Sequence, residues 1–175
     1  MAGRAWKALE LDARLAEVVA APVFVLSGDD DGLRSHCLGV LKSALAPADS
    51  PGSTVRVFEG PASAREVFEE LRTIPFLGLA GRRVVVVERG DAFLQAHWPP
   101  LLRFLQKPSA DGRLILCVGR LNPNSPPRGS GARGDAQADR AADWRTLMGL
   151  MASEGVVIDC ARLTGATTSS CQLSS

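Results

Sequence analysis

Apolar residues recur along the chain with two alternating periods. Helical spacing of three or four residues occurs over residues 11–19, 33–45, 63–74, 98–105 and 144–151. Short apolar or alternating runs predict strands at 23–26, 54–58, 82–88, 113–118 and 155–160. The four consecutive valines at 84–87 indicate a strand that is buried on both faces. This order of elements predicts an α/β domain with a five-stranded, mostly parallel sheet and helices on both of its faces.

Local signals mark where some of these helices begin and end. Ser63 followed by Glu66 predicts a capping box, in which each side chain satisfies a free N–H at the start of a helix. Pro75 ends that helix, because its ring disfavours helical geometry in the residue before it. Pro99 is tolerated in the first turn of the helix expected at 98–105.

Two segments depart from this pattern. Residues 122–143 are rich in Pro, Gly, Ser, Ala and alternating charge, and they contain no large aliphatic side chain. Because such a stretch cannot offset its ordering entropy by burial, we expect a mobile insertion there. The small, polar residues 164–175 predict a disordered tail. The sequence therefore predicts one domain over residues 1–163.

Composition narrows the functional classes. The chain has 175 residues, of which 46% are hydrophobic, and a net charge of +1, so no global field draws it to nucleic acid or to a lipid surface. Its longest apolar run has nine residues and contains Pro22, too short for a membrane helix. Four widely spaced cysteines and two histidines predict neither a disulfide framework nor a metal site. We expect a soluble, cytoplasmic protein.

The loop after the first long strand is where an α/β domain would bind phosphate. It reads Gly28, Asp29, Asp30, Asp31, Gly32, whereas a phosphate-binding loop reads GxxxxGK[ST]. The glycines are one residue too close, Leu33 replaces the lysine, and three carboxylates would repel a triphosphate. We interpret the loop as degenerate, with the aspartates acting as turn and helix N-cap, and expect no nucleotide or other cofactor.

Other catalytic arrangements are equally incomplete. A receiver domain needs an aspartate after its third strand and a lysine after its fifth, where this chain offers Glu88-Arg89 and Arg162. There is no GxSxG motif, and neither His36 nor His97 has nucleophile partners nearby in sequence. We expect no catalytic site, although a P-loop-like ATPase or a receiver-type signalling domain stays as the alternative.

The segment TIPFLGLAGRR (73–83) is unusually apolar for a connection between a helix and a strand. Pro75 stiffens it and Gly78 opens it, so that Phe76 and Leu77 can project together. They either seal the end of the core or form an anchor for a pocket on a partner protein.

Taken in order, several stretches resemble the N-terminal domain of the delta subunit of the bacterial DNA polymerase III clamp loader. They are VFVLSGDDDGLRSHCLGVLKSAL, VRVFEG, ASAREVFEELRTIPFLG with RRVVVVERGDAF, LLRFLQKPSADGRLILCVG and GVVIDC. The resemblance covers most of residues 8–163 apart from the insertion. It implies a three-layer P-loop NTPase-like (AAA+ type) fold in which nucleotide binding has been lost.

The resemblance also implies a function. In that family this domain binds the sliding clamp and opens the ring at one interface during DNA replication. The family's clamp-binding element matches Ile74, Pro75, Phe76, Leu77 and Gly78 here, with Phe76 and Leu77 as the paired anchors. The chain would then be a non-catalytic subunit of the DNA-directed DNA polymerase holoenzyme, a nucleotidyltransferase.

Two departures limit what the resemblance implies. The helical lid and collar domains of the family are absent, which leaves open a fragment, a frameshifted product or a minimal version and argues against assembly with the other loader subunits. The insertion at 122–143 stands where related ATPases keep a polar sensor residue, to which Asn122 is nearest. DNA contact is the lesser expectation, through scattered cations at Arg82, Arg83, Arg103, Lys107 and Arg113.

Overall fold

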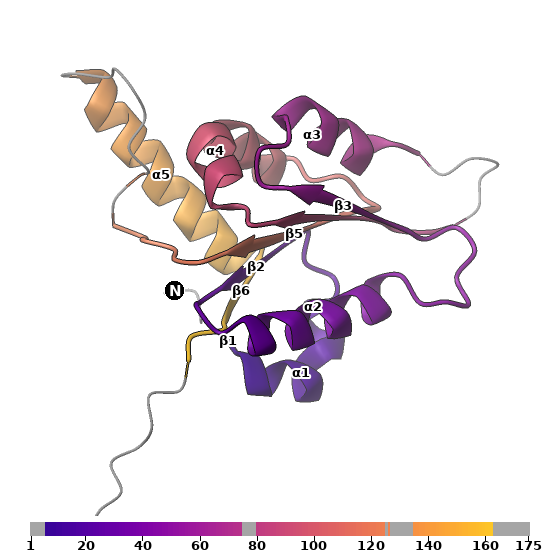
Figure 1. Ribbon diagram of the computed structural model, residues 1–175. Coiled ribbons are helices and arrows are strands. Elements are labelled where there is room, and N and C mark those ends of the chain that lie inside the picture. Colours follow the sequence, from indigo (N-terminus) through magenta and orange to yellow (C-terminus); the bar gives the residue numbers. More distant parts are fainter. Residues whose placement is uncertain (1–5, 75–79, 125, 127–134, 163–175) are drawn as a thin grey trace, which may run out of the picture.

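A computed structural model describes residues 6–74, 80–124, 126 and 135–162. In this part of the chain six parallel strands form one sheet, in the order β1-β6-β2-β5-β4-β3 (Figure 1). The strands are β1 (Trp6–Lys7), β2 (Val23–Ser27), β3 (Thr54–Glu59), β4 (Arg83–Glu88), β5 (Gly112–Val118) and β6 (Val156–Asp159). The prediction of five strands missed β1. Two residues carry no periodicity, and they form a strand only because β6 offers its free edge to them.

Helices cover both faces of this sheet. They are α1 (Leu11–Val18), α2 (Asp31–Leu45), α3 (Ala64–Arg72), α4 (Asp91–Gln106) and α5 (Asp135–Ser153), with a 3-10 turn, η1 (Ala8–Glu10), before α1. Helices α1 and α2 lie on one face, and α3, α4 and α5 lie on the other (Figure 1). The predicted three-layer α/β architecture is therefore confirmed. None of the described helices is long and apolar enough to span a membrane.

The four consecutive valines of β4 contribute side chains to the hydrophobic cores on both faces of the sheet. Val84 and Val86 pack with α1 and α2, whereas Val85 and Val87 pack with α3, α4 and α5. All four are buried, since successive side chains of a strand point to opposite faces. The core under α3, α4 and α5 includes an aromatic pair, Trp98 and Trp144, packed edge to face with ring centroids 5.6 Å apart.

Helix α4 is longer than the expected 98–105. It begins at Asp91, and its backbone departs from helical geometry at His97, where φ is −128° and ψ is 20°. Pro99 therefore lies in the first turn of the segment after this break, where its missing N–H costs little, as predicted. The earlier half was missed because Phe93 and Leu94 alone carry its buried face.

Part of the segment expected to be an insertion is helical. Residues 135–143 belong to α5, so the expectation of a mobile insertion over 122–143 is wrong for this half. Four of these nine residues are alanine, the best helix former, and they extend a helix that Trp144, Leu147 and Met151 hold against the core. Burial is not needed along every turn of such a helix. The expected tail, 164–175, lies outside the described residues.

Candidate functional site

Helix α3 leads to the predicted anchor and is fixed at its start and along one face. The Ser63 hydroxyl oxygen accepts a hydrogen bond from the Glu66 N–H (3.2 Å) and donates one to the Glu66 carboxylate (2.8 Å). The N-cap is therefore confirmed, but the reciprocal half of the predicted capping box is not found, because the Glu66 carboxylate bonds to the Ser63 hydroxyl and not to its N–H. Val67, Phe68 and Leu71 are buried against the sheet, and the Phe68 ring lies 5.6 Å from that of Phe104. The helix is a firm support for whatever follows it.

The helix ends at Arg72, before Pro75, as predicted. Thr73 takes an extended conformation with ψ of 121°, which turns the chain away from the helix axis. Ile74 follows with 83% of its surface exposed, the most exposed of the large apolar residues that the structure describes. The other four residues of the predicted anchor, Pro75 to Gly78, lie outside the described residues.

The connection between α3 and β4, called the anchor loop below, begins and ends at the amino edge of the sheet, the edge where the parallel strands start. The carbonyl oxygen of Leu71 approaches Gly112 so closely that a Cβ there would stand 2.4 Å from it. After the loop, Gly81 packs against the backbone of Gly52. A Cβ added to Gly81 would stand 2.0 Å from the carbonyl carbon of Gly52. These contacts fix the end of α3 and the residues just before β4 at this edge.

The opposite, carboxyl edge holds the loop that sequence analysis interpreted as a degenerate phosphate loop. Asp30 is the N-cap of α2, and its carboxylate accepts a hydrogen bond from the Leu33 N–H (3.0 Å). The Gly28 N–H donates to the carbonyl of Val118 (3.2 Å), and the Asp30 N–H donates to that of Cys160 (3.1 Å). The interpretation of these aspartates as turn and cap is confirmed. Three N–H groups that could face a phosphate already have partners.

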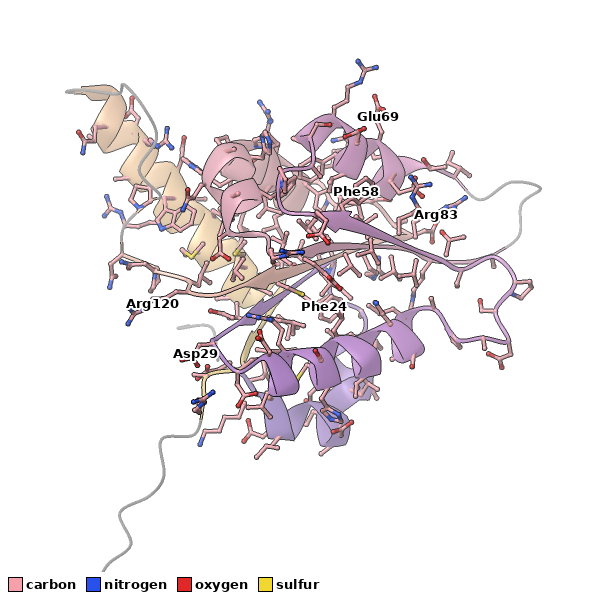
Figure 2. The ribbon with its side chains drawn as sticks, viewed as in Figure 1. Phe24, Asp29, Phe58, Glu69, Arg83 and Arg120 are labelled. Carbon is pink, nitrogen blue, oxygen red and sulfur yellow. The ribbon has the colours of Figure 1, made fainter. Side chains whose placement is uncertain are left out.

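Hydrogen bonds and an ion pair made by side chains also hold this loop in place. The Asp29 carboxylate accepts a hydrogen bond from the Arg162 N–H (3.0 Å), and this bond is the main cause that lowers the pKa of Asp29 (Figure 2). Arg34 donates to the Gly28 carbonyl (2.8 Å) and pairs with Asp31. A loop held by its own carboxylates in this way opposes the approach of a polyphosphate.

Two further carboxylates of this edge, those of Asp91 and Glu59, are also engaged. Asp91 accepts the Gly119 N–H with both oxygens, at 3.0 and 3.1 Å. Arg89, a non-glycine residue with φ of 50°, pairs with Glu59 at 3.1 Å. No group of three or more metal-ligating side chains occurs among the described residues. Glu88 and Asp91 thus do not form a receiver-type acidic cluster with the aspartates after β2.

His36, His97 and Cys117 take part in ion pairing and packing. His36 is exposed on α2 and pairs with Asp12 of α1 at 3.0 Å, a bond that raises the pKa of His36. His97 packs at the α4 break, 5.2 Å from the Phe93 ring. Burial raises the pKa of the Cys117 thiol to about 11, so this side chain stays protonated and inert at neutral pH.

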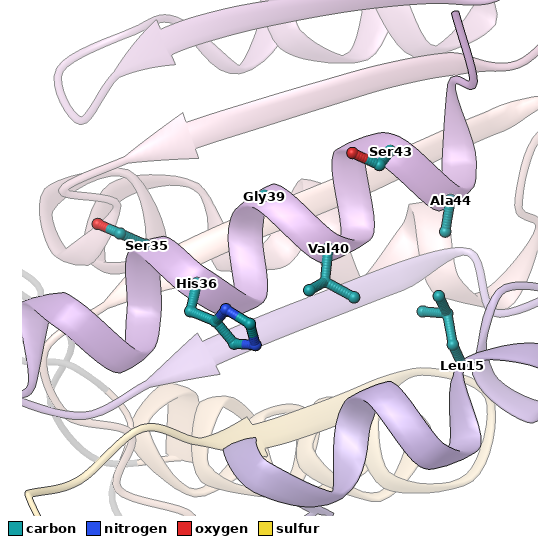
Figure 3. Close-up of a pocket in the computed structure, with 7 residues that line it drawn as sticks. All are labelled: Leu15, Ser35, His36, Gly39, Val40, Ser43 and Ala44. Atoms are coloured by element: carbon teal, nitrogen blue, oxygen red, sulfur yellow. The ribbon is translucent and has the colours of Figure 1, made fainter.

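An open groove of about 620 Å³ lies along the outer face of α2 (Figure 3). It is lined by Leu15, Ser35, His36, Gly39, Val40, Ser43 and Ala44. The small side chains at positions 35, 39 and 43 recur every four residues and leave the α2 backbone accessible. Sequence analysis did not identify this groove, because it depends on how α1 packs beside α2.

The basic residues considered for DNA contact differ in their neighbours. The guanidinium of Arg83 donates to Thr54 of β3 (2.8 Å) and lies 3.9 Å from Glu70 of α3 (Figure 2). Arg82 and Arg113 are close enough that the charge of one affects the other. Strand register, not sequence spacing, brings this pair together.

The sequence matches no protein-family model and no curated protein sequence. Among solved structures, the chain is similar to the DNA clamp loader delta protein of Bacillus subtilis, with a TM-score of 0.62 and 15% sequence identity. The match covers 89% of this chain and 43% of that one.

The chain has a clamp-loader-like AAA+ fold. At 15% identity the match establishes the fold alone, and it extends over nearly the whole chain. The fold expected from the resemblance in sequence is confirmed, with six strands in place of five. This chain spans less than half the length of the Bacillus protein.

Proposed function

We propose that this chain is a delta-like clamp-loader domain that binds a sliding clamp through residues 74–78 and opens the ring at one interface. The observation that carries the proposal is the position of Ile74. It is 83% exposed, and it directly follows a helix whose other apolar side chains are buried. An aliphatic side chain held in water on a firm support gains free energy when a partner covers it.

The mechanism is mechanical. Ile74, Phe76 and Leu77 enter an apolar pocket on the clamp, and α3 transmits the strain because Val67, Phe68 and Leu71 fix it to the sheet. A rigid support is needed, since a lever that bends locally would relax without deforming the ring.

The domain works without nucleotide. The N–H groups of Gly28, Asp30 and Leu33, which an ATP phosphate would need, already donate to the Val118 carbonyl, the Cys160 carbonyl and the Asp30 carboxylate. ATP would then act elsewhere in the assembly, whose further partners are the other loader subunits. The chain would belong to the cytoplasmic DNA polymerase III holoenzyme without itself being catalytic.

The test is retention of the purified sliding clamp of the source organism on the immobilised chain. The double substitution Phe76→Ala with Leu77→Ala should abolish retention, whereas Leu9→Ala should preserve it. Leu9 is a matched control because it is also an exposed aliphatic residue, at 67%, and lies in η1 next to the opposite edge of the sheet.

Two results would overturn the proposal. If the double variant unfolds at a much lower temperature than the wild type, the two side chains belong to the core and are not an anchor. If the wild type does not retain the clamp, or binds ATP with Mg²⁺ in equilibrium dialysis, the function lies in another class. If the wild type does retain the clamp, a fluorophore pair placed across the clamp interface measures ring opening separately from binding.

A further inference from the structure

Two arginines meet at the amino edge of the sheet, beside the ends of the anchor loop. Arg113 on β5 lies opposite Val84 on β4, and Val84 faces the core under α2. Directly opposite residues of paired strands share a face, so Arg113 points to the α2 side. Arg82 precedes β4 and lines a pocket with Ala44 and Leu45 of α2, which places it on that same side.

Neither guanidinium group forms a direct ion pair within the part of the chain that the structure describes. No carboxylate lies within 4.0 Å of either guanidinium among the described residues. Asp111 is the nearest acidic influence on Arg113. Burial, and after it the charge of Arg82, lowers the pKa of Arg113, yet a guanidinium keeps its proton at neutral pH. Two like charges are therefore held together in a partly buried position.

Arg113 also has unused hydrogen-bonding capacity. One terminal nitrogen donates to the carbonyls of Ala110 and Gly112, each at 2.9 Å, while its buried Nε has no partner. A buried N–H without an acceptor is costly, and an anion brought close would lower that cost.

A pocket of about 340 Å³ lies beside this pair. Its polar lining consists of Arg82, Asp111, Ser50 and Ser53, beside apolar residues such as Ala44 and Leu45. Ser53 is occupied, because its oxygen accepts the Arg82 N–H (3.1 Å) and meets Ser50 (2.9 Å). The charged side chains that line this pocket are thus Arg82 and Asp111.

Apolar and cationic residues share this edge. Ile74 follows α3, whose end lies against Gly112, one residue from Arg113. The exposed cations Arg72 and Lys107 end α3 and α4 at the same edge. An exposed aliphatic side chain at an edge that also carries cations fits a protein surface with an apolar pocket, since a phosphodiester backbone offers no such pocket.

We propose that Arg82 and Arg113 bind carboxylates that surround the apolar pocket in which the partner protein receives Ile74. This inference rests on the proposed function and adds the chemistry of the partner surface, an acidic rim. Charges at a rim mainly accelerate association and select the partner, so their effect must fall as salt rises.

The experiment measures clamp affinity of the Arg82→Gln and Arg113→Gln variants at about 0.05 M and about 0.5 M salt. Each substitution should weaken binding about three- to tenfold at low salt and have little effect at high salt, in line with rim charges. The matched control is Arg120→Gln. Arg120 is exposed just beyond the other end of β5, at the opposite edge of the sheet (Figure 2), and its loss should leave affinity unchanged.

Each outcome separates the two proposals. If the wild type binds the clamp and both variants bind equally well at low salt, the acidic rim is wrong and the anchor stands. If the wild type does not bind, the proposed function itself fails. If the variants instead lose affinity for a labelled DNA duplex that the wild type binds at the same salt, the edge recognises phosphate. Should Arg113→Gln unfold, the Arg82→Gln variant alone gives the same test.

Discussion

The packing of the loop after β2 predicts that one chemical change has opposite effects at two glycines. Gly28 has φ of 151°, a conformation that residues with a Cβ rarely adopt. A Cβ on Gly28 would stand 2.1 Å from the carbonyl carbon of Cys160 and 2.3 Å from its oxygen. Gly39, within α2, has no such neighbour within 4 Å of its Cβ position. Gly28→Ala should therefore destabilise the fold, and Gly39→Ala should stabilise it.

The magnitude for Gly28→Ala follows from two contributions. An unfavourable φ costs about 1–3 kcal/mol. The overlap with the Cys160 carbonyl involves backbone atoms, so no side-chain rotation relieves it, and the loop must move. Movement breaks the hydrogen bonds from Gly28 to Val118 and from Asp30 to Cys160, each of about 1 kcal/mol. We expect a loss of about 3–5 kcal/mol in the free energy of unfolding.

Gly39→Ala is the matched control. It removes backbone freedom from the unfolded chain and adds no clash, so it should add about 0.5–1 kcal/mol. Urea unfolding followed by tryptophan fluorescence measures both changes. With a slope of about 2 kcal/mol per molar urea, the Gly28→Ala midpoint should fall by about 2 M and the Gly39→Ala midpoint should rise by about 0.4 M.

Either of two results would refute this reasoning. A Gly28→Ala midpoint equal to that of the wild type would mean that the loop does not pack against residue 160 in solution. The argument that its N–H groups are occupied would then fail, and with it the support for a nucleotide-free domain. A destabilised Gly39→Ala would mean that the outer face of α2 is covered.

Two further predictions concern single contacts. Ser63→Ala should lower the free energy of unfolding by about 1 kcal/mol, because it removes the N-cap of α3, whereas Ser63→Asp should restore most of it; an unchanged midpoint for the alanine variant would contradict the cap. The pair between His36 and Asp12 raises the pKa of His36, so its stabilisation is complete below about pH 6.5 and disappears as pH rises through the raised value. The melting-temperature advantage of the wild type over His36→Gln should accordingly be larger at about pH 5.5 than at about pH 9, and an advantage that grows with pH would disprove it.

Sequence patterns predicted the central part of the fold for a physical reason. A strand buried on both faces must be apolar at every position, so residues 84–87 were recognisable without any neighbour. Capping is likewise local: Ser63 and Glu66 meet because they are three residues apart. The aspartates after β2 were recognisable as a turn and cap because Asp30 bonds to the N–H three residues ahead.

Tertiary structure decided what depends on distant partners. Strand β1 exists because β6 has a free edge, and residues 135–143 are helical because the rest of α5 is packed on α4 and the sheet. Arg82 and Arg113 lie 31 positions apart in the sequence, and only the register of β4 with β5 makes them neighbours. The sequence by itself determined which segments are strands and helices, since periodicity and capping act within a few residues. Which charges share an edge was determined by strand pairing, which no local pattern encodes.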